Sequence, residues 1–269
     1  MSGDRLPTYF LSHGGGPWSY MDGPGRQGYA KLEQSLVDMR PELKSRVRAI
    51  LMISGHWEET GFAISSAAQP GMVYDYGGFP DYLYRIRYAA PGSPALAARV
   101  RDLLTAGNVS ARLDDQRGFD HGTFSVMHVL APEEDMPIVQ LSMDSRMDPA
   151  LHLQVGRLLA PLRDEGVLIV GSGFSFHNFF IREARAGESS KGFDAWLQDV
   201  LVCSKPAERT QQLIRWQEAP FARAAHPHED HLIPLMVAAG AAEQEQGECN
   251  YHQTDFWNHH TVSSFRFGT

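Results

Sequence analysis

The stretch TYFLSHGGGP, residues 8–17, shows a pattern that returns twice more along the chain. Its first five residues predict a short buried strand, and the glycines after His13 predict a tight loop, because repeated glycine does not sustain a strand. RAILMISGHW, residues 48–57, and GVLIVGSG, residues 166–173 leading to His177, repeat the arrangement. Three buried strands that each run into a glycine-flanked histidine indicate a sheet with polar groups gathered at its strand ends.

Helical patterns alternate with these strands. Pro94–Ala106 and Pro149–Leu162 have amphipathic spacing, and a further helix is predicted over His231–Ala242. Thr261–Phe267 alternates in the manner of an edge or closing strand. Strands that alternate with helices predict an α/β fold, with a central mixed sheet flanked by helices and a cleft at the strand ends. With no linker or repeat in the sequence, we expect a single domain over residues 1–269.

The composition argues against several classes of protein. A formal net charge of -8 is unsuited to nucleic-acid binding, which needs positive charge to face the phosphates. The two cysteines, Cys203 and Cys249, have neither the number nor the spacing of a disulfide framework or a structural zinc module. Free thiols, together with the lack of a signal-peptide pattern or a long apolar run, favour a cytoplasmic protein without a membrane span. The sequence leaves homo-oligomerisation open.

The strand-end histidines are candidates for a metal site. In open α/β sheets, ligands bind beyond the carboxyl ends of the strands, and imidazole is the commonest metal-binding side chain. His13, His56 and His177 follow three such strands. Each histidine taken singly fits a hydrogen-bonded loop residue as well, but their recurrence at equivalent places indicates an open metal site.

A fourth histidine stands beside an acid in GFDHG, residues 118–122. As part of an ordinary turn, Asp120 would cap the helix that follows. An ordinary capped turn is the alternative to an active-site loop here. Three C-terminal histidines are expected to be packing or surface residues, since their spacing does not demand a metal: His252, His259 and His260.

The richest histidine cluster is AHPHEDHL, residues 225–232. Asp230 is expected to cap the last predicted helix, and His231 to project from the first turn of that helix. A solvated polar loop is the alternative for His226 and His228. His231 is therefore one further candidate metal ligand, held in place by the predicted helix.

In their order along the chain, these motifs resemble one family. It is the family of 4,5-DOPA-type extradiol dioxygenases, the single-chain branch of the class III (LigB-like) aromatic ring-opening dioxygenases. The resemblance runs from Tyr9 to about Gly240, and only the joint set of motifs is specific. The motifs are Ser12–Pro17, Ile53–Trp57, Asp75–Pro80, Asp120–Gly122, Gly171–Gly173 with His177–Asn178, and His226–Pro227 with His231.

The resemblance implies a non-haem metal site. His13 and His56 match two metal ligands of the family. The third ligand in relatives lies at the start of a late helix, where this chain offers His231, which fits that register better than His226 or His228. Fe(II) is the implied metal. Three neutral histidines in place of the usual two histidines and one carboxylate also suit Zn(II), which is the alternative.

The resemblance also implies the chemistry of an oxidoreductase. His177 matches the acid–base histidine, and His121 the second active-site histidine, which contacts substrate or the bound oxygen species. The implied reaction takes a small catechol-type aromatic and O2, inserts both oxygen atoms, and opens the ring to a muconic semialdehyde-type product. A zinc-dependent hydrolase on the same histidines and a non-catalytic metal-binding module are the alternatives, although His121 and His177, as residues beyond the ligands, favour catalysis.

The expected substrate pocket is aromatic. Four side chains near the motifs are candidates to line an apolar slot for a flat ring: Trp18, Trp57, Tyr76 and Phe79. Core packing is the alternative, and we favour it for at least two of the four. His226 is a further candidate for contact with substrate.

Overall fold

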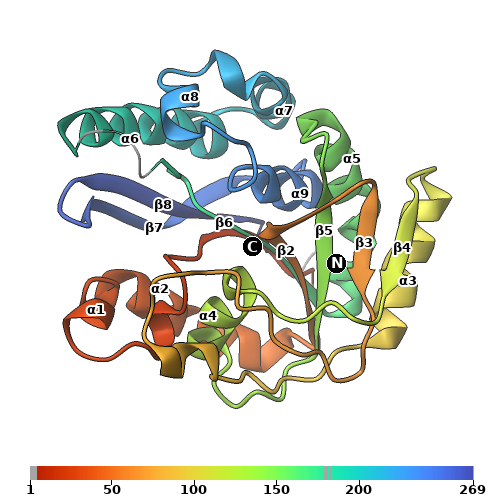
Figure 1. Cartoon of the computed structure of the whole chain (residues 1–269). Coiled ribbons are helices and arrows are strands. Elements are labelled where there is room, and N and C mark those ends of the chain that lie inside the picture. The colour runs from red at the N-terminus through yellow and green to blue at the C-terminus, as the bar shows by residue number, and fades with distance from the viewer. Residues whose placement is uncertain (1–4, 179–180, 182, 269) are drawn as a thin grey trace.

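Eight strands pair into one mixed sheet in the computed structural model of the chain, which describes residues 5–178, 181 and 183–268. The order across the sheet is β4-β3-β5-β2-β6-β1-β8-β7, with helices on both faces (Figure 1). The predicted single-domain α/β fold with a mixed sheet is thereby confirmed. The strands are β1 (Thr8–Ser12), β2 (Ala49–Glu59), β3 (Phe62–Ser65), β4 (Ala111–Asp114), β5 (Ile138–Asp144), β6 (Val167–Gly173), β7 (Gly247–Phe256) and β8 (His260–Phe267).

The middle of the sheet is parallel. β1 pairs with β6, and both β6 and β5 pair with β2, all in parallel. Three outer pairs are antiparallel, namely β8 with β1, β7 with β8 and β3 with β5, whereas the edge strand β4 pairs in parallel with β3. The carboxyl ends of the four central strands therefore meet along one edge, which is where ligands bind in sheets of this kind.

Two layers of helices enclose this sheet. In Figure 1, α2 and α4 lie below it, while α9 and the α6–α8 group lie above. The helices are α1 (Pro24–Gln27), α2 (Ala30–Arg46), α3 (Pro94–Ala106), α4 (His121–Leu130), α5 (Pro149–Leu159), α6 (Glu183–Gln198), α7 (Pro206–Ile214), α8 (Ala222–Ala225) and α9 (Ile233–Ala241). Shorter helical segments are Trp18–Tyr20, Asp81–Tyr84, Ala160–Glu165, Asp199–Cys203 and Trp216–Glu218.

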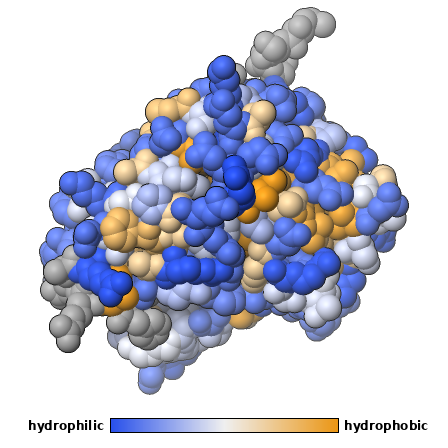
Figure 2. Space-filling model, turned by 90° about the horizontal axis from the view of Figure 1, so that it is seen from above, coloured by the Kyte–Doolittle hydropathy of each residue, from blue (hydrophilic) through white to orange (hydrophobic). Residues whose placement is uncertain are grey.

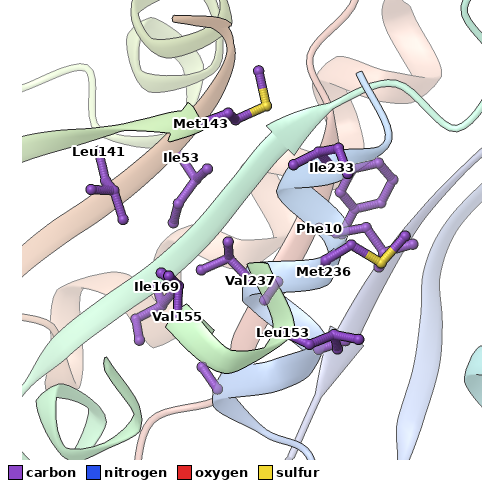
Figure 3. Close-up of a cluster of buried hydrophobic side chains, with 14 of the residues drawn as sticks. Phe10, Ile53, Leu141, Met143, Leu153, Val155, Ile169, Ile233, Met236 and Val237 are labelled. Carbon is purple, nitrogen blue, oxygen red and sulfur yellow. The ribbon is translucent and has the colours of Figure 1, made fainter. Parts of the chain in front are cut away.

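The larger half of the core lies between the sheet and the pair α5 and α9. Ile53 and Ile169 of the central strands point toward Val155 of α5 and Val237 of α9 (Figure 3), and all four are fully buried. Burying such a side chain contributes about 1.5–3 kcal/mol. The core therefore fixes α9 against β6, and with it the segment that enters α9.

Polar residues cover most of the face seen from above α6–α8, and hydrophobic residues appear there only in smaller patches (Figure 2). The exposed large hydrophobic side chains among the described residues are Tyr74, Tyr82, Leu113 and Phe221. None of the described helices combines the length and the apolar character that crossing a bilayer requires.

The strands differ from the sequence-based expectation in three places. β2 does not stop before His56 but continues to Glu59, so this histidine lies inside the strand. The predicted strand at Thr261–Phe267 is present, but as β8 it lies between β1 and β7 and is not an edge. β7 was not predicted, because its buried positions are separated by polar residues that face solvent.

The start of the last helix also differs. α9 begins at Ile233, with a proline in its first turn, and no side chain caps it. The prediction that Asp230 caps this helix is wrong, because its carboxylate faces the His231 ring instead. His231 thus lies in the turn before the helix. The predicted cap by Asp120 is confirmed, since its carboxylate accepts the Thr123 N–H at 3.1 Å.

Gly173 allows this turn to lie directly on β6. A Cβ atom at Gly173 would stand 2.1 Å from the His231 carbonyl oxygen. We expect Gly173→Ala to lower the free energy of unfolding by about 1–3 kcal/mol, because the backbone must shift to admit the methyl group. Chemical denaturation measures this, with Gly71→Ala as the control, since nothing lies within 4 Å of that position. Equal stability of the two variants would contradict the expected close packing.

Candidate metal centre

Three histidines from distant parts of the chain converge at the carboxyl edge of the sheet. His13 follows β1, His56 lies near the end of β2, and His231 precedes α9. Their ring centroids are 5.0 Å apart for His13 and His56, 5.1 Å for His13 and His231, and 4.7 Å for His56 and His231. One ring nitrogen of each lies within 4.8 Å of the other two. The structure thus brings together the three predicted ligands.

Each of these rings is backed by an oxygen at Nδ1. The His13 Nδ1 lies 2.8 Å from the Gly14 carbonyl oxygen, and the His56 Nδ1 lies 3.2 Å from an Asp75 carboxylate oxygen. The His231 Nδ1 lies 2.8 Å from Asp230 Oδ2, at an angle too bent for a hydrogen bond. A negative or partly negative oxygen beside each Nδ1 favours hydrogen on that nitrogen and leaves the Nε2 lone pair directed inward, as in histidines that bind metal.

The inward nitrogens fit a cation. The Nε2 atoms of His56 and His231 are 3.1 Å apart, and the buried Nε2 of His13 has no hydrogen-bond partner within the described part of the chain. Two nitrogens this close have either a shared proton or a positive ion between them. With hydrogen on both Nδ1 atoms, the facing Nε2 lone pairs suit the ion. A metal about 2.1 Å from each nitrogen sets neighbouring nitrogens roughly 3.0–3.4 Å apart for angles of roughly 90–109°. The donor set therefore suits a metal held by three neutral imidazoles.

Burial keeps these rings neutral. It lowers the pKa of His56 to about 4, and the nearby His121 adds to the shift. Burial also lowers the pKa values of His13 and His231 well below the ordinary histidine value, with neighbouring histidines acting in the same direction. Because a metal binds the deprotonated imidazole, the three ligands are ready for binding at neutral pH.

Asp75 belongs to the centre but was assigned no role from sequence, although its motif was part of the resemblance. Its Oδ1 accepts from the backbone N–H of His121 at 3.1 Å and lies 2.9 Å from that residue's Nδ1, while its Oδ2 faces His56. Burial opposes ionisation of Asp75, but the bonds with His121 outweigh it and lower the pKa of the carboxyl. One carboxylate therefore orients two of the clustered rings.

The two predicted catalytic histidines flank the centre at different corners. His121, the first residue of α4, has its ring centroid 3.9 Å from that of His56 and 5.2 Å from that of His13. His177 stacks on His231 with ring centroids 3.5 Å apart and planes at 10°. Burial lowers the pKa of His177, and the Asp230 charge opposes the shift. Both rings thus border the space around the three inward nitrogens.

The aromatic candidates separate into two groups. Trp18 and Trp57 are buried: the Trp18 indole donates to the His13 carbonyl oxygen at 2.7 Å, and that of Trp57 to Glu59 at 3.1 Å. Tyr76 and Phe79 are only half-buried. Tyr76 has its ring centroid 6.0 Å from that of His121, and its hydroxyl donates to the Leu83 carbonyl oxygen.

Phe79 packs on the glycine loop after His13, since a Cβ at Gly16 would lie 2.7 Å from the phenyl ring. His226 is fully buried, with Nε2 3.1 Å from the Ser175 carbonyl oxygen and its ring against Phe193 and Trp216. Burial lowers its pKa to about 3. The described ring contacts do not join His226 to the three inward-facing histidines, so its place is that of a core residue.

A large open cavity lies elsewhere in the molecule. Its volume is about 960 Å³, and it opens between α6 and the hairpin of β7 and β8. The residues that line it include none of the clustered histidines, so cavity size alone does not locate the metal centre. The convergence of nitrogen donors is the better guide.

Comparison with known proteins agrees with this geometry. The family model described as the catalytic LigB subunit of aromatic ring-opening dioxygenase matches residues 7–267. The chain belongs to this LigB family. Its members are non-haem metal dioxygenases, and the histidine cluster is suited to hold such a metal.

Relatives of this LigB chain include proteins named for one substrate. It is 36% identical to the 4,5-DOPA dioxygenase extradiol of Beta vulgaris, with 92% of this chain and 91% of the relative covered. It is 34% identical to the protein of that name from Escherichia coli K12, with 91% and 89% covered. Dioxygenase tasH of Hapsidospora irregularis is 38% identical over 89% of this chain and 79% of its own length.

A solved structure shares the fold. The crystal structure of the uncharacterized protein JW3007 from Escherichia coli K12 superposes with a TM-score of 0.79 at 29% identity. It covers 98% of this chain, which covers 100% of that protein. The mixed sheet and its helical layers are thus the fold of a LigB-like protein.

Asp75→Asn tests the orienting carboxylate. The amide keeps the shape but loses the charge and one acceptor, so we expect metal affinity or activity to fall about 10- to 100-fold. Competition with a chelator measures the affinity. Asp81→Asn is the matched control, an exposed acid at the start of the short helix Asp81–Tyr84, and should leave metal binding unchanged. If both variants bind metal as the wild type does, Asp75 does not orient the ligands.

Proposed function

We propose that this LigB-family chain, as one catalytic domain over residues 1–269, is an extradiol dioxygenase for catechol-type aromatics that uses Fe(II) held by His13, His56 and His231. The reaction inserts both atoms of O2 beside the diol and gives a muconic semialdehyde-type product without an external reductant. One observation carries the proposal: three inward Nε2 atoms flanked by two further histidines.

The bound metal would supply the site for the diol and O2 and would lower the pKa of the catechol hydroxyls. His177 is suited to take the second hydroxyl proton, because its lowered pKa keeps the ring neutral at pH 7. Its stack on His231 holds it beside the ligands without using its ring nitrogens in that contact. The same ring, once protonated, would return its proton to the product side of the reaction.

His121 would stabilise the developing negative charge on oxygen. The Asp75 carboxylate only accepts hydrogen bonds, so it favours a hydrogen on the His121 Nδ1. The opposite nitrogen, Nε2, donates when the ring is charged. A donor aimed at a developing oxyanion contributes roughly 3 kcal/mol.

Two carboxylates outside the ligand set bear on the metal. Three neutral histidines leave the metal more positive than a set of two histidines and one carboxylate does. Asp75 and Asp230, which lie behind His56 and His231, restore negative charge close to the centre. Such carboxylates also stand behind zinc-bound histidines, so the proposal of Fe(II) rests on the family, and metal analysis tests it against Zn(II).

Tyr76 and Phe79 are proposed to contact the substrate ring. Both are partly accessible and border the centre, beside His121 and the glycine loop respectively. The buried positions of Trp18, Trp57 and His226 give them supporting roles instead. Since relatives are named for 4,5-DOPA dioxygenase activity, DOPA is the first substrate to test.

Anaerobic reconstitution with Fe(II), followed by oxygen uptake and near-UV/visible spectra with DOPA and other catechols, tests the proposal. Stoichiometric uptake with a yellow semialdehyde product is the expected result. Tight metal binding without uptake on any catechol would favour a zinc-dependent hydrolase or a non-catalytic metal-binding protein.

A further inference from the structure

His56 lies in a part of β2 that the sheet itself does not hold. β2 pairs with β5 up to Ile53 and again from Glu58, and with β6 up to Ser54. Within the described pairing, Gly55, His56 and Trp57 have no strand partner. The backbone of a proposed ligand therefore needs another support if its Nε2 is to stay in place.

That support comes from one buried carboxylate, Asp120. Its Oδ1 accepts from the Ser54 hydroxyl at 2.7 Å, and the Ser54 oxygen accepts the His56 N–H at 3.2 Å. Its Oδ2 accepts from Arg117 Nη2 at 2.7 Å, and the same Nη2 donates to the His56 carbonyl oxygen at 3.1 Å. The His56 N–H is thus linked to Asp120 through Ser54, and the His56 carbonyl through Arg117.

Asp120 is also fixed to the rest of the fold. It is fully buried, it caps α4 through the Thr123 N–H, and it lies 3.2 Å from the Gln140 amide nitrogen of β5. α4 begins with His121. The Asp120 carboxylate therefore holds the backbone of His56 in a fixed position relative to α4, the helix that carries His121.

The Arg117 guanidinium is held from a third side. It lies over the Trp57 ring, 4.8 Å from the ring centroid, and its side chain is only 16% exposed. Both of its hydrogen bonds come from Nη2, whose two N–H directions the planar guanidinium fixes, and a lysine ammonium on a flexible stem reproduces neither these directions nor the flat contact with the indole. These contacts together hold the unpaired residues 55–57 of β2 in place.

We infer that Arg117, with Asp120 and Ser54, forms a clamp that positions His56 for metal binding. Arg117 is a positioning residue, because it acts on the metal through the His56 backbone. The inference rests on the proposed function, since it takes His56 as a ligand. It adds an arginine and a serine that lie outside the ligand and acid–base set.

The test compares metal affinity in Arg117→Met, Arg117→Lys and the wild type, by competition of Zn(II) and Co(II) with a chelator. We expect Arg117→Met to weaken binding about 10- to 100-fold, with Arg117→Lys between it and the wild type. The visible spectrum of the Co(II) form should change in Arg117→Met, since it reports ligand geometry. Wild-type affinity and spectrum in Arg117→Met would overturn the inference.

Arg209→Met separates positioning from general stability. Arg209 is also buried and donates to backbone carbonyls, those of Ala242, Glu243 and Glu245 after the far end of α9. This variant should lower the melting temperature and leave metal affinity unchanged. If it weakens metal binding as much as Arg117→Met, the loss reflects stability and the clamp is refuted.

A double-mutant cycle shows whether the clamp acts through His56. In a His56→Ala background, Arg117→Met should weaken metal binding little further, whereas in a His13→Ala background it should keep its full effect. Equal effects in both backgrounds would overturn the inference. A wild-type chain that binds neither metal would overturn the proposed metal site and the clamp together, while metal binding without ring opening would reject only the dioxygenase activity.

Discussion

His231→Ala is expected to weaken metal binding by at least about 100-fold, roughly 2.7 kcal/mol or more. The variant removes one of the three nitrogens that face the metal. Loss of a ligand lowers metal affinity more than loss of a residue that only hydrogen-bonds to a ligand. It also leaves His56 Nε2 without its neighbour at 3.1 Å. Chelator competition with Zn(II) and Co(II) gives the dissociation constants, and metal analysis after dialysis gives the retained stoichiometry.

His228→Ala is the matched control for this change. It lies three residues earlier in the same segment, but its side chain is 60% exposed and faces Glu58 and Asp230. Metal affinity should therefore stay at the wild-type level. Unchanged affinity in His231→Ala would move the third ligand to another histidine of the segment, and a loss in His228→Ala would identify which one.

His177→Phe is expected to retain the metal and lose ring opening, with kcat/KM lower by about 100- to 10,000-fold. Phenylalanine keeps a flat ring against His231, where the native rings are parallel at 3.5 Å, but has no nitrogen to take a proton. Metal content and dissociation constant should match the wild type. Oxygen uptake and semialdehyde formation with DOPA measure the loss.

His252→Phe controls for the loss of a histidine elsewhere. This side chain is 44% exposed and lies in the large cavity beside α6, with Nδ1 2.9 Å from the Ser263 hydroxyl. Its activity should stay near that of the wild type. If His177→Phe cleaves catechols at the normal rate, the acid–base role belongs to another group, and His121 is the first to examine.

Local patterns predicted the strands and the strand-end histidines well. The buried runs before His13 and in GVLIVGSG are strands, and Asp120 caps α4 as expected, because these features depend on neighbouring residues only. β7 escaped prediction because it depends on pairing with β8, and polar residues interrupt its apolar positions. Its detection required a partner strand that local periodicity does not reveal.

In the site too, local sequence patterns predicted some residues, while others were identified only from the tertiary structure. The histidine motifs named the three proposed ligands in advance, and the structure places them within reach of one ion. The motifs gave no role to Asp75, which lies 46 residues from His121 in sequence, and none to Arg117. These partners act through hydrogen bonds across loops, so only folding brings the donors and acceptors together.

The sequence by itself determined the α/β class, the strand ends on which the site is built and the set of histidines available for a metal. Periodicity, glycine and imidazole chemistry are local properties, and they suffice for that much. The tertiary structure decided which ring nitrogens face inward, because Asp75, Asp230 and the Gly14 carbonyl occupy the opposite sides. It also decided that His226 is core and that a buried carboxylate at Asp120 holds the backbone of His56.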